Sequence, residues 1–265
     1  MPFHFLHRVK QQNPLVHCIT NIVVTNFSAN GLLALGASPF MSTMHEEAED
    51  IQQFANGLLI NIGTITQTDV QAMFTAAKAA NAAGVPVVLD PVGVGATRYR
   101  RHITTQLLQQ IQFAVIRGNI SEIAFLAGEE SRGKGVDAGE TQGDNAQIAK
   151  TAAKKYRCVV AVSGETDVIS DGERIIKIHN GTTLLPKVTG TGCLLGAVIA
   201  AFVGVAEKDQ NLQACVEACL AYAVAGELAA KGLQQEVGTF AVKFIDQLAA
   251  LTPDLINQYA RVSYA

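Results

Sequence analysis

The sequence predicts an α/β protein built on a mostly parallel sheet, and three observations support this fold class. Short apolar runs alternate with longer amphipathic runs along the whole chain. The apolar runs are continuous, which is typical of strands that helices cover on both faces. An Asp171-Gly172 turn between two extended runs indicates a hairpin, which adds antiparallel strands at one edge. The expected architecture is a three-layer α/β/α domain that spans residues 1–265.

The individual elements follow from periodicity and from residues that start or stop helices. Extended segments are predicted over residues 15–19, 38–42, 57–63, 85–89, 113–116 and 158–162, with the hairpin over 168–176. Helices are predicted over residues 24–35, 46–54, 66–83, 120–127, 146–156, 194–205, 212–231, 239–251 and 254–259. Residues 128–144 are rich in Gly, Glu and Lys, which predicts a mobile loop.

Composition narrows the classes of partner. The chain has 265 residues, of which 49% are hydrophobic and 16% charged, with a net charge of −3. Because no basic run is present, nucleic acid and anionic membrane surfaces are poor candidates. The first twelve residues lack the apolar core of a signal peptide, and no apolar run is predicted to span a membrane. Five cysteines without a CxxC motif indicate free thiols. We therefore expect a soluble, cytoplasmic protein.

A glycine-rich turn in the C-terminal half of the chain is the strongest candidate for a functional site. Gly190 and Gly192 permit backbone conformations and close approaches that other residues do not. Thr189 and Thr191 suit the N-cap region of the apolar helix that follows. A helix that begins here directs unpaired N–H groups and the positive end of its dipole at one place, which predicts an anion site. Cys193 adds an ionisable side chain to the same turn.

Polar residues also follow several of the predicted strands. In α/β folds the ligand lies outside the carboxyl ends of the strands. The polar residues expected there are Asn61 to Gly63, Asp90, Arg117 to Asn119, and Ser163 with Gly164. Asn119 and Glu122 are three residues apart at a helix start, so they face the same side. Oxygen ligands of this kind suit Mg²⁺ shared with substrate phosphates, and an arginine fork suits phosphate oxygens. Each residue alone would equally fit a turn or a helix cap, but together they favour phosphate chemistry.

Six stretches of the chain, in the same order, resemble the hydroxyethylthiazole kinases of the ribokinase superfamily. They are residues 14–21, 36–41, 89–93, 117–122, 162–167 and 188–193. The resemblance implies a ribokinase-like fold without a separate lid domain. It also implies that the protein phosphorylates the hydroxyl of 4-methyl-5-(2-hydroxyethyl)thiazole, with ATP and Mg²⁺, in thiamine salvage. Members of this family are trimers with active sites between subunits, so the resemblance further implies a homotrimer.

The resemblance also implies roles for individual residues. Contacts with ATP are implied for Arg117, Ser163 and Thr189, and a role with Mg²⁺ for Asp90, Asn119 and Glu122. Contacts with the thiazole are implied for Met41, Gly190, Asn21 and Gly63. Cys193 stands where the wider superfamily has an aspartate base, and Gly190 and Gly192 would help hold the phosphoryl group. A helix N-terminus is expected to lower the pKa of Cys193 from about 8.5.

Other classes of protein fit the sequence less well. A dinucleotide oxidoreductase is disfavoured because the glycine spacing is one residue too long and no acid-ended strand follows. An enzyme with Cys193 as nucleophile would need a histidine partner, which the sequence does not place. Within the superfamily, a kinase for hydroxymethylpyrimidine or pyridoxal is the main alternative. An ATP-binding sensor without turnover is the alternative that is not an enzyme.

Overall fold

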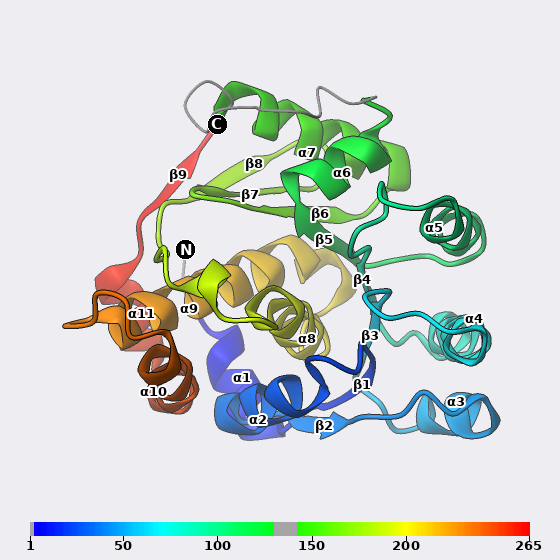
Figure 1. The fold of residues 1–265 in the computed structure, drawn as a ribbon, viewed down its shortest axis with the longest axis horizontal. Coiled ribbons are helices and arrows are strands. Elements are labelled where there is room, and N and C mark those ends of the chain that lie inside the picture. The colour runs from blue at the N-terminus through cyan, green and yellow to red at the C-terminus, as the bar shows by residue number, and fades with distance from the viewer. Residues whose placement is uncertain (1–2, 130–141) are drawn as a thin grey trace.

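The computed structural model describes residues 3–129 and 142–265, and a single nine-stranded sheet runs through its centre (Figure 1). The strands lie in the order β2-β1-β3-β4-β5-β6-β7-β8-β9. Their bounds are β1 Leu15–Ile19, β2 Ser38–Phe40, β3 Gly57–Asn61, β4 Val87–Asp90, β5 Val115–Asn119, β6 Val159–Ser163, β7 Asp167–Ser170, β8 Ile175–Ile178 and β9 Val262–Tyr264. Pairing is parallel from β2 through β6 and antiparallel from β6 through β9.

Helices cover both faces of this sheet, which confirms the predicted three-layer α/β/α fold. One face carries α1 Phe5–Gln12, α2 Thr25–Leu35, α8 Thr191–Val203, α9 Asn211–Ala230, α10 Val237–Ala250 and α11 Pro253–Tyr259. The other carries α3 Ala48–Ile51, α4 Gln67–Ala83, α5 Arg98–Gln110, α6 Ile120–Ala127 and α7 Gln142–Tyr156. The short 3-10 helices are η1 His45–Glu47, η2 Leu185–Lys187 and η3 Lys208–Gln210. That residues 1–265 form one domain stays a prediction.

Alternation along the strands decides which side chains face α8. Val88 and Val115 belong to the apolar core on the α8 side, whereas Leu89 and Ile116 belong to the opposite core. Because every second residue of a strand lies on the same face, residues two positions further along face α8 as well. Four polar residues at the strand ends obey this rule, namely Asn61, Asp90, Arg117 and Ser163. The sheet therefore presents a polar edge to the N-terminus of its most buried helix.

Several predicted elements need correction. The predicted edge hairpin is β7–β8, but it does not form the edge because β9 pairs with β8. Helix α8 begins at Thr191 rather than at residue 194, since the glycine turn itself is its N-terminus. Most of the loop predicted over 128–144 lies outside the described residues, and α7 already begins at Gln142.

A membrane-spanning segment was not predicted, yet one helix is long and apolar enough by length and composition. It covers residues 208–230, which contain η3 and α9, with a mean hydropathy of 1.3 over its most apolar stretch. Of that stretch, 83% is buried inside the fold. The helix packs against α8 and α10 through many alanines, whose small side chains permit close packing on all sides. Its apolar composition is accounted for by burial between neighbouring helices.

Three elements were not predicted from the sequence: α1, α5 and β9. The case of α1 is instructive, because its N-terminus is capped from far along the chain. The Glu217 carboxylate on α9 accepts hydrogen bonds from the backbone N–H groups of His4, Phe5 and Leu6, at 2.9, 3.0 and 2.8 Å. These are N–H groups that a helix cannot pair internally. The residues around position 5 cannot predict this cap, because Glu217 lies 213 residues away from His4 in the sequence.

Candidate active site

The path of the chain through the sheet reverses at β1. This strand has β2 on one side and β3 on the other, so the strand order runs outward from it in both directions. In open α/β sheets, ligands bind outside the carboxyl ends of the strands at such a reversal. Asn21 lies two residues past β1, and Asn61 is the last residue of β3. The Asn21 Nδ2 donates to Asn61 Oδ1 at 2.9 Å, so the two side chains meet at this point.

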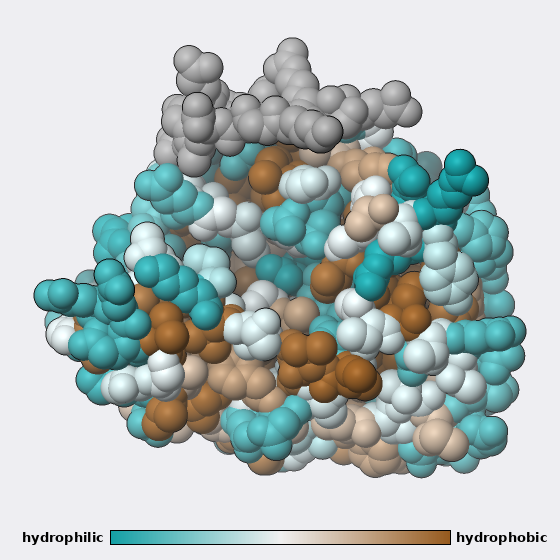
Figure 2. Space-filling model, viewed as in Figure 1, coloured by the Kyte–Doolittle hydropathy of each residue, from teal (hydrophilic) through white to brown (hydrophobic). Residues whose placement is uncertain are grey.

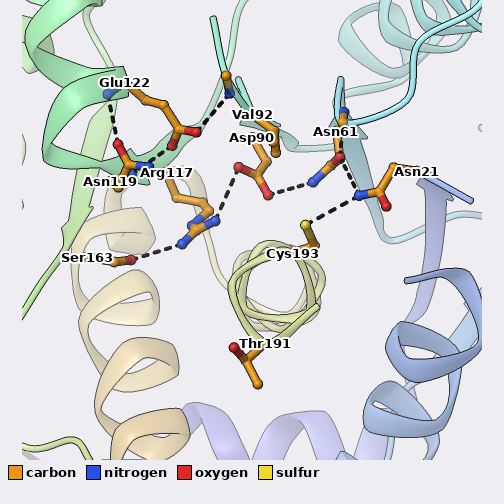
Figure 3. Close-up of polar contacts among 12 residues, drawn as sticks. Asn21, Asn61, Asp90, Val92, Arg117, Asn119, Glu122, Ser163, Thr191 and Cys193 are labelled. Carbon is orange, nitrogen blue, oxygen red and sulfur yellow. Dashed lines mark hydrogen bonds and ion pairs between the residues drawn. The ribbon is translucent and has the colours of Figure 1, made fainter. Parts of the chain in front are cut away.

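An ion pair lies beside this reversal, at the ends of the next two strands. Arg117 Nη1 is 3.2 Å from Asp90 Oδ1, and Arg117 Nη2 donates to Ser163 Oγ at 3.0 Å (Figure 3). The guanidinium also lies against the first turn of α8, because a Cβ on Gly192 would be 3.4 Å from Nη1. Three predicted site residues and the glycine turn are therefore brought together.

Two asparagines extend this ion pair into a continuous chain of hydrogen bonds. Asn61 Nδ2 donates to Asp90 Oδ2 at 2.6 Å, and Asn21 Nδ2 donates to Cys193 Sγ at 3.3 Å (Figure 3). The chain of contacts runs from Ser163 to Cys193 and joins four strand ends to α8. Asn61 was predicted to lie at this edge as a polar residue at the end of a buried strand, but the sequence assigned it no role in the site.

Burial sets the electrostatics of this ion pair. The Asp90 side chain is fully buried, and burial raises its pKa to about 6, although Arg117 and Asn61 oppose that change. Burial alone would lower the pKa of Arg117, but the carboxylates of Asp90 and Glu122 raise it above its usual value. The Arg117 Nε is buried without a hydrogen-bond partner among the described residues. The Arg117 guanidinium therefore stays charged, and within the described residues its Nε–H has no acceptor.

The N-terminus of α8 is open because no side chain caps it. Gly190 occupies the N-cap position with φ of 92°, in the left-handed region, and a Cβ there would lie 2.9 Å from Val24 Cγ1. The Thr191 hydroxyl donates to the carbonyls of residues 185 and 188 at 2.8 and 3.0 Å, which corrects the expectation that it caps the helix. Within the described residues, no backbone partner accepts from the N–H of Gly192 or Cys193. These two amides remain available to an anion.

The expected low pKa of Cys193 is wrong. The thiol is half-buried at the third position of α8, and its pKa is raised above 9.0. Burial is the largest cause and the nearby Asp90 carboxylate is the second, while the amides of Asn61 and Asn21 oppose both. A helix N-terminus favours a thiolate only when desolvation and a neighbouring carboxylate do not outweigh it. The thiol is therefore protonated at neutral pH.

A second group of predicted residues forms the N-terminus of α6. Asn119 Oδ1 accepts from the backbone N–H of Glu122 at 2.9 Å, and Glu122 Oε2 accepts from that of Asn119 at 2.8 Å. The other carboxylate oxygen, Oε1, accepts from the backbone N–H of Gly93 at 2.9 Å. This is a complete capping box tied to the loop after β4. Its carboxylate is close enough to Asp90 to help raise that residue's pKa.

The remaining predicted residues lie at the same edge of the sheet but outside the hydrogen-bonded chain. Met41 follows β2 directly and is half-buried, and Thr189 is exposed before α8. Among the described hydrogen bonds, none joins either side chain to Asp90, Arg117 or Cys193. Gly63 does join the site, because its backbone N–H donates to Asn61 Oδ1 at 2.9 Å. One unpredicted residue, Arg100, holds this turn through the carbonyls of residues 62, 63 and 92.

The fold defines a structural class, the proteins with a ribokinase-like three-layer α/β/α fold. A solved structure of pyridoxal kinase from Staphylococcus aureus, in complex with AMP-PCP and pyridoxal, superposes on 95% of the chain with a TM-score of 0.63. The superposition covers 98% of that kinase, but the two sequences are only 14% identical, so the likeness concerns the fold alone.

Sequence comparison identifies the family within this class. The chain belongs to the hydroxyethylthiazole kinase family, whose model matches residues 6–254. A hydroxyethylthiazole kinase of Actinobacillus succinogenes is 63% identical over 265 residues, covering 99% of this chain and 98% of that protein. A solved structure of the hydroxyethylthiazole kinase protein from Pyrococcus horikoshii has a TM-score of 0.90 at 39% identity, covering 99% and 98% of the two chains. The resemblance noted in the sequence is confirmed.

Proposed function

We propose that this protein transfers the γ-phosphoryl group of ATP to the hydroxyl of 4-methyl-5-(2-hydroxyethyl)thiazole, a step of thiamine salvage. One observation carries the proposal: the open N-terminus of α8 lies against the Arg117–Asp90 ion pair, at the edge where α/β folds bind ligands. The names of the family and of the relatives support the thiazole alcohol as the acceptor.

In this proposal the chain supplies charge stabilisation rather than covalent chemistry. Phosphoryl transfer passes through a loose transition state, in which negative charge is spread over the equatorial oxygens. The amides of Gly192 and Cys193 would donate to those oxygens from fixed positions, so little reorganisation is needed. Arg117 would bind the phosphate tail of ATP, with Ser163 fixing its guanidinium and Thr189 nearby. Gly190 sets the turn that points both amides in one direction.

The residues proposed for Mg²⁺ have suitable chemistry. Asp90, Asn119 and Glu122 offer carboxylate and amide oxygens, which this cation prefers. Each carboxylate oxygen of Glu122 accepts one described hydrogen bond, which leaves a second lone pair free. Glu122 and Asn119 would hold the ion together with phosphate oxygens, while the buried Asp90 would contribute mainly charge. Bound there, the ion would neutralise charge on the phosphates of ATP.

The acceptor alcohol would lie on the Cys193 side of the hydrogen-bonded chain. Asn21 and Gly63 border the thiol, and Met41 and Gly190 would contact the thiazole ring from β2 and from the turn. In this proposal the Cys193 sulfur receives the alcohol's proton. Only the thiolate form of Cys193 can accept this proton, and it is a minor form at neutral pH because the pKa of the thiol is raised. A loose transition state demands little proton transfer before the phosphoryl group moves, so a minor thiolate fraction is sufficient.

We further propose that the protein is a cytoplasmic homotrimer with active sites at the subunit interfaces. Ile22 and Val23 follow Asn21 directly, yet their side chains are 83% and 62% exposed. Figure 2 shows apolar surface over the loop between β1 and α2, where these residues lie. Burial of such surface in a partner would stabilise an oligomer. Light scattering should give three times the chain mass, and Ile22→Asp should lower the measured mass.

The cytoplasmic location is supported by the cysteines, because free thiols fit a reducing compartment.

An ATP-consumption assay over thiazole, pyrimidine and pyridine alcohols tests the proposed activity. We expect turnover with the thiazole alcohol, and little with hydroxymethylpyrimidine or pyridoxal. Turnover only with a pyrimidine or pyridine alcohol would replace the substrate, and no turnover with any alcohol would favour an ATP-binding sensor. Cys193→Ala should reduce kcat while ATP affinity stays nearly unchanged. Loss of ATP affinity in that variant would remove Cys193 from the proposed role.

A further inference from the structure

Asn61 has no part in the proposed chemistry, yet its side chain is 1% exposed and uses both of its amide atoms inside the site. It lies between Asp90 and Asn21, and Asn21 in turn contacts the Cys193 sulfur (Figure 3). We propose that Asn61 is a positioning residue that fixes the Asn21 amide with its NH₂ group toward the Cys193 sulfur. The importance of Asn61 for catalysis rests on the proposed function, whereas the orientation of the Asn21 amide by Asn61 does not.

A backbone N–H group sets the orientation of the Asn61 amide. The N–H of Gly63 lies 2.9 Å from one terminal atom of the side chain, and a backbone N–H can only donate. That atom must therefore be the oxygen. The other terminal atom is the nitrogen, which lies 2.6 Å from Asp90 Oδ2, an acceptor in its ionised state. Both contacts are satisfied by one orientation and both are lost in the reverse one.

The fixed oxygen of Asn61 then sets the orientation of Asn21. The Asn21 atom 2.9 Å from Asn61 Oδ1 must be a donor, so it is the nitrogen. The same nitrogen lies 3.3 Å from Cys193 Sγ, so it donates to the sulfur as well. With the Asn21 amide reversed, two oxygens would face each other and the sulfur would lose its donor. A donor at this place stabilises the thiolate, which is the form that arises as the sulfur is deprotonated.

The turn that provides the Gly63 N–H is itself held in place. The Arg100 guanidinium donates to the carbonyls of residues 63 and 92 at 2.6 and 2.7 Å, and also to that of residue 62. Gly63 packs so closely on Asn21 that a Cβ would lie 2.8 Å from the Asn21 Nδ2. The Gly63 N–H that orients the Asn61 amide is therefore held in a fixed position. Both asparagines are too buried for water to replace their hydrogen-bond partners.

Three other titratable groups lie near Cys193, and their influence on the pKa of its thiol has to be distinguished from that of the Asn21 amide. The Asp90 carboxylate raises the pKa of the thiol and the Arg117 guanidinium lowers it, while burial raises it most. Tyr222, from α9, is buried and lies near the thiol as well, and burial raises its own pKa well above the usual value. None of these groups depends on the Asn21 amide for its place. The Asn61 amide also lowers the pKa of the thiol itself, so removal of Asn61 should raise that pKa by at least as much as removal of Asn21.

Alkylation by iodoacetamide measures the thiolate of Cys193 without any substrate. The other four cysteines are buried, so Cys193 should react first, and Cys193→Ser gives the background rate. We expect Asn61→Leu to raise the midpoint of the rate against pH by about one unit, so that labelling near pH 7.5 is about tenfold slower. Asn21→Leu should shift the midpoint in the same direction, by no more than Asn61→Leu does. The double variant should shift it by less than the sum of the two single shifts, because Asn61 acts in part through Asn21.

Matched variants separate this role from general loss of stability. Asn180→Leu removes another buried asparagine, 3% exposed and bonded to Glu227 and the carbonyl of residue 259, and should leave the midpoint unchanged. Asn61→Ser, too short to reach Asn21, should repeat the shift if Asn61→Leu fails to fold. An unshifted midpoint with Asn61→Leu or Asn61→Ser, or fully additive shifts in the double variant, would overturn the inference. Wild-type protein without kinase turnover would overturn the proposed function but not this result.

Discussion

Two helices begin at the same edge of the sheet, on either side of the Arg117–Asp90 ion pair, and their N-termini are built in opposite ways. Helix α6 is closed by a capping box, in which Asn119 and Glu122 satisfy each other's backbone N–H groups. Helix α8 begins on a glycine without any side-chain cap. A side-chain cap at an N-terminus stabilises the helix, whereas an uncapped N-terminus leaves its backbone N–H groups available to a ligand. The carboxylate at α6 and the free amides at α8 thus belong to the proposed cation site and the proposed anion site, which share one arginine.

The largest effect should come from the arginine that both helices share. Arg117→Ala leaves the Asp90 carboxylate buried without its cation, and it removes the proposed contact with ATP. We expect kcat/KM to fall by about a thousandfold or more and the free energy of unfolding by about 3–5 kcal/mol. Steady-state kinetics and urea denaturation measure the two losses. Near-normal kcat/KM in a folded Arg117→Ala variant would make the ion pair purely structural.

The capping box of α6 should matter for activity as well as stability. Glu122→Gln removes the charge and keeps only one of two acceptor oxygens, so the backbone N–H of either Asn119 or Gly93 loses its partner. We expect kcat to fall by about a hundredfold and the free energy of unfolding by about 1–2 kcal/mol. The box at α4, formed by Thr66 and Asp69, is a matched control, and Asp69→Asn should cost only about 1 kcal/mol of stability. Equal activity of the two variants would reduce the Glu122 box to an ordinary cap.

The open turn of α8 can be compared with a glycine of the same backbone conformation elsewhere. Gly190 has φ of 92° and Gly128, which ends α6, has φ of 90°. An alanine at either position costs about 1 kcal/mol of backbone strain. Gly190→Ala also meets Val24 and displaces the free amides, so we expect a further ten- to hundredfold loss of kcat. Gly128→Ala should keep full kcat, because within the described residues beyond its own helix and chain neighbours only Lys155 Nζ lies within 4 Å of the new Cβ. Equal kcat values would remove the α8 turn from catalysis.

The smallest effect concerns the pH dependence of stability. The folded-state pKa of Asp90 is about 6, above its ordinary 3.8, so the folded protein binds more protons than the unfolded chain between these pH values. Stability contributed by this group therefore falls as the pH rises from about 4 to about 6. The difference in unfolding free energy between wild type and Asp90→Asn should shrink by about 2 kcal/mol over that range. A difference that grows with pH would mean that Arg117 outweighs burial.

The sequence was sufficient for what depends on local pattern. Continuous apolar runs predicted the parallel strands, and the glycine turn predicted the start of α8 to within three residues, although Thr191 does not cap the helix as expected. Polar residues at strand ends predicted the edge where Asp90, Arg117 and Ser163 meet, because alternation places them on one face. Met41 and Thr189 rest on resemblance alone, and their roles stay predictions.

What the sequence could not supply depends on long-range contacts. Glu217 caps α1 from α9, and α1 alone has no cap that a pattern search would find. Asn61 lies 29 residues before the Asp90 carboxylate to which it donates. The pKa of Cys193 was predicted in the wrong direction because the dipole of a helix is visible in the sequence and the burial of the thiol beside a carboxylate is not.

Protection of Cys193 by a mimic of the transferring phosphoryl group tests most directly whether that group passes the open N-terminus of α8. Labelling of Cys193 by iodoacetamide would be measured with ADP, Mg²⁺ and the thiazole alcohol, with and without aluminium fluoride. The mimic should slow labelling by a further tenfold or more in wild-type protein and in Gly128→Ala, but by much less in Gly190→Ala. Equal labelling with and without aluminium fluoride in wild-type protein would contradict the role of the α8 turn.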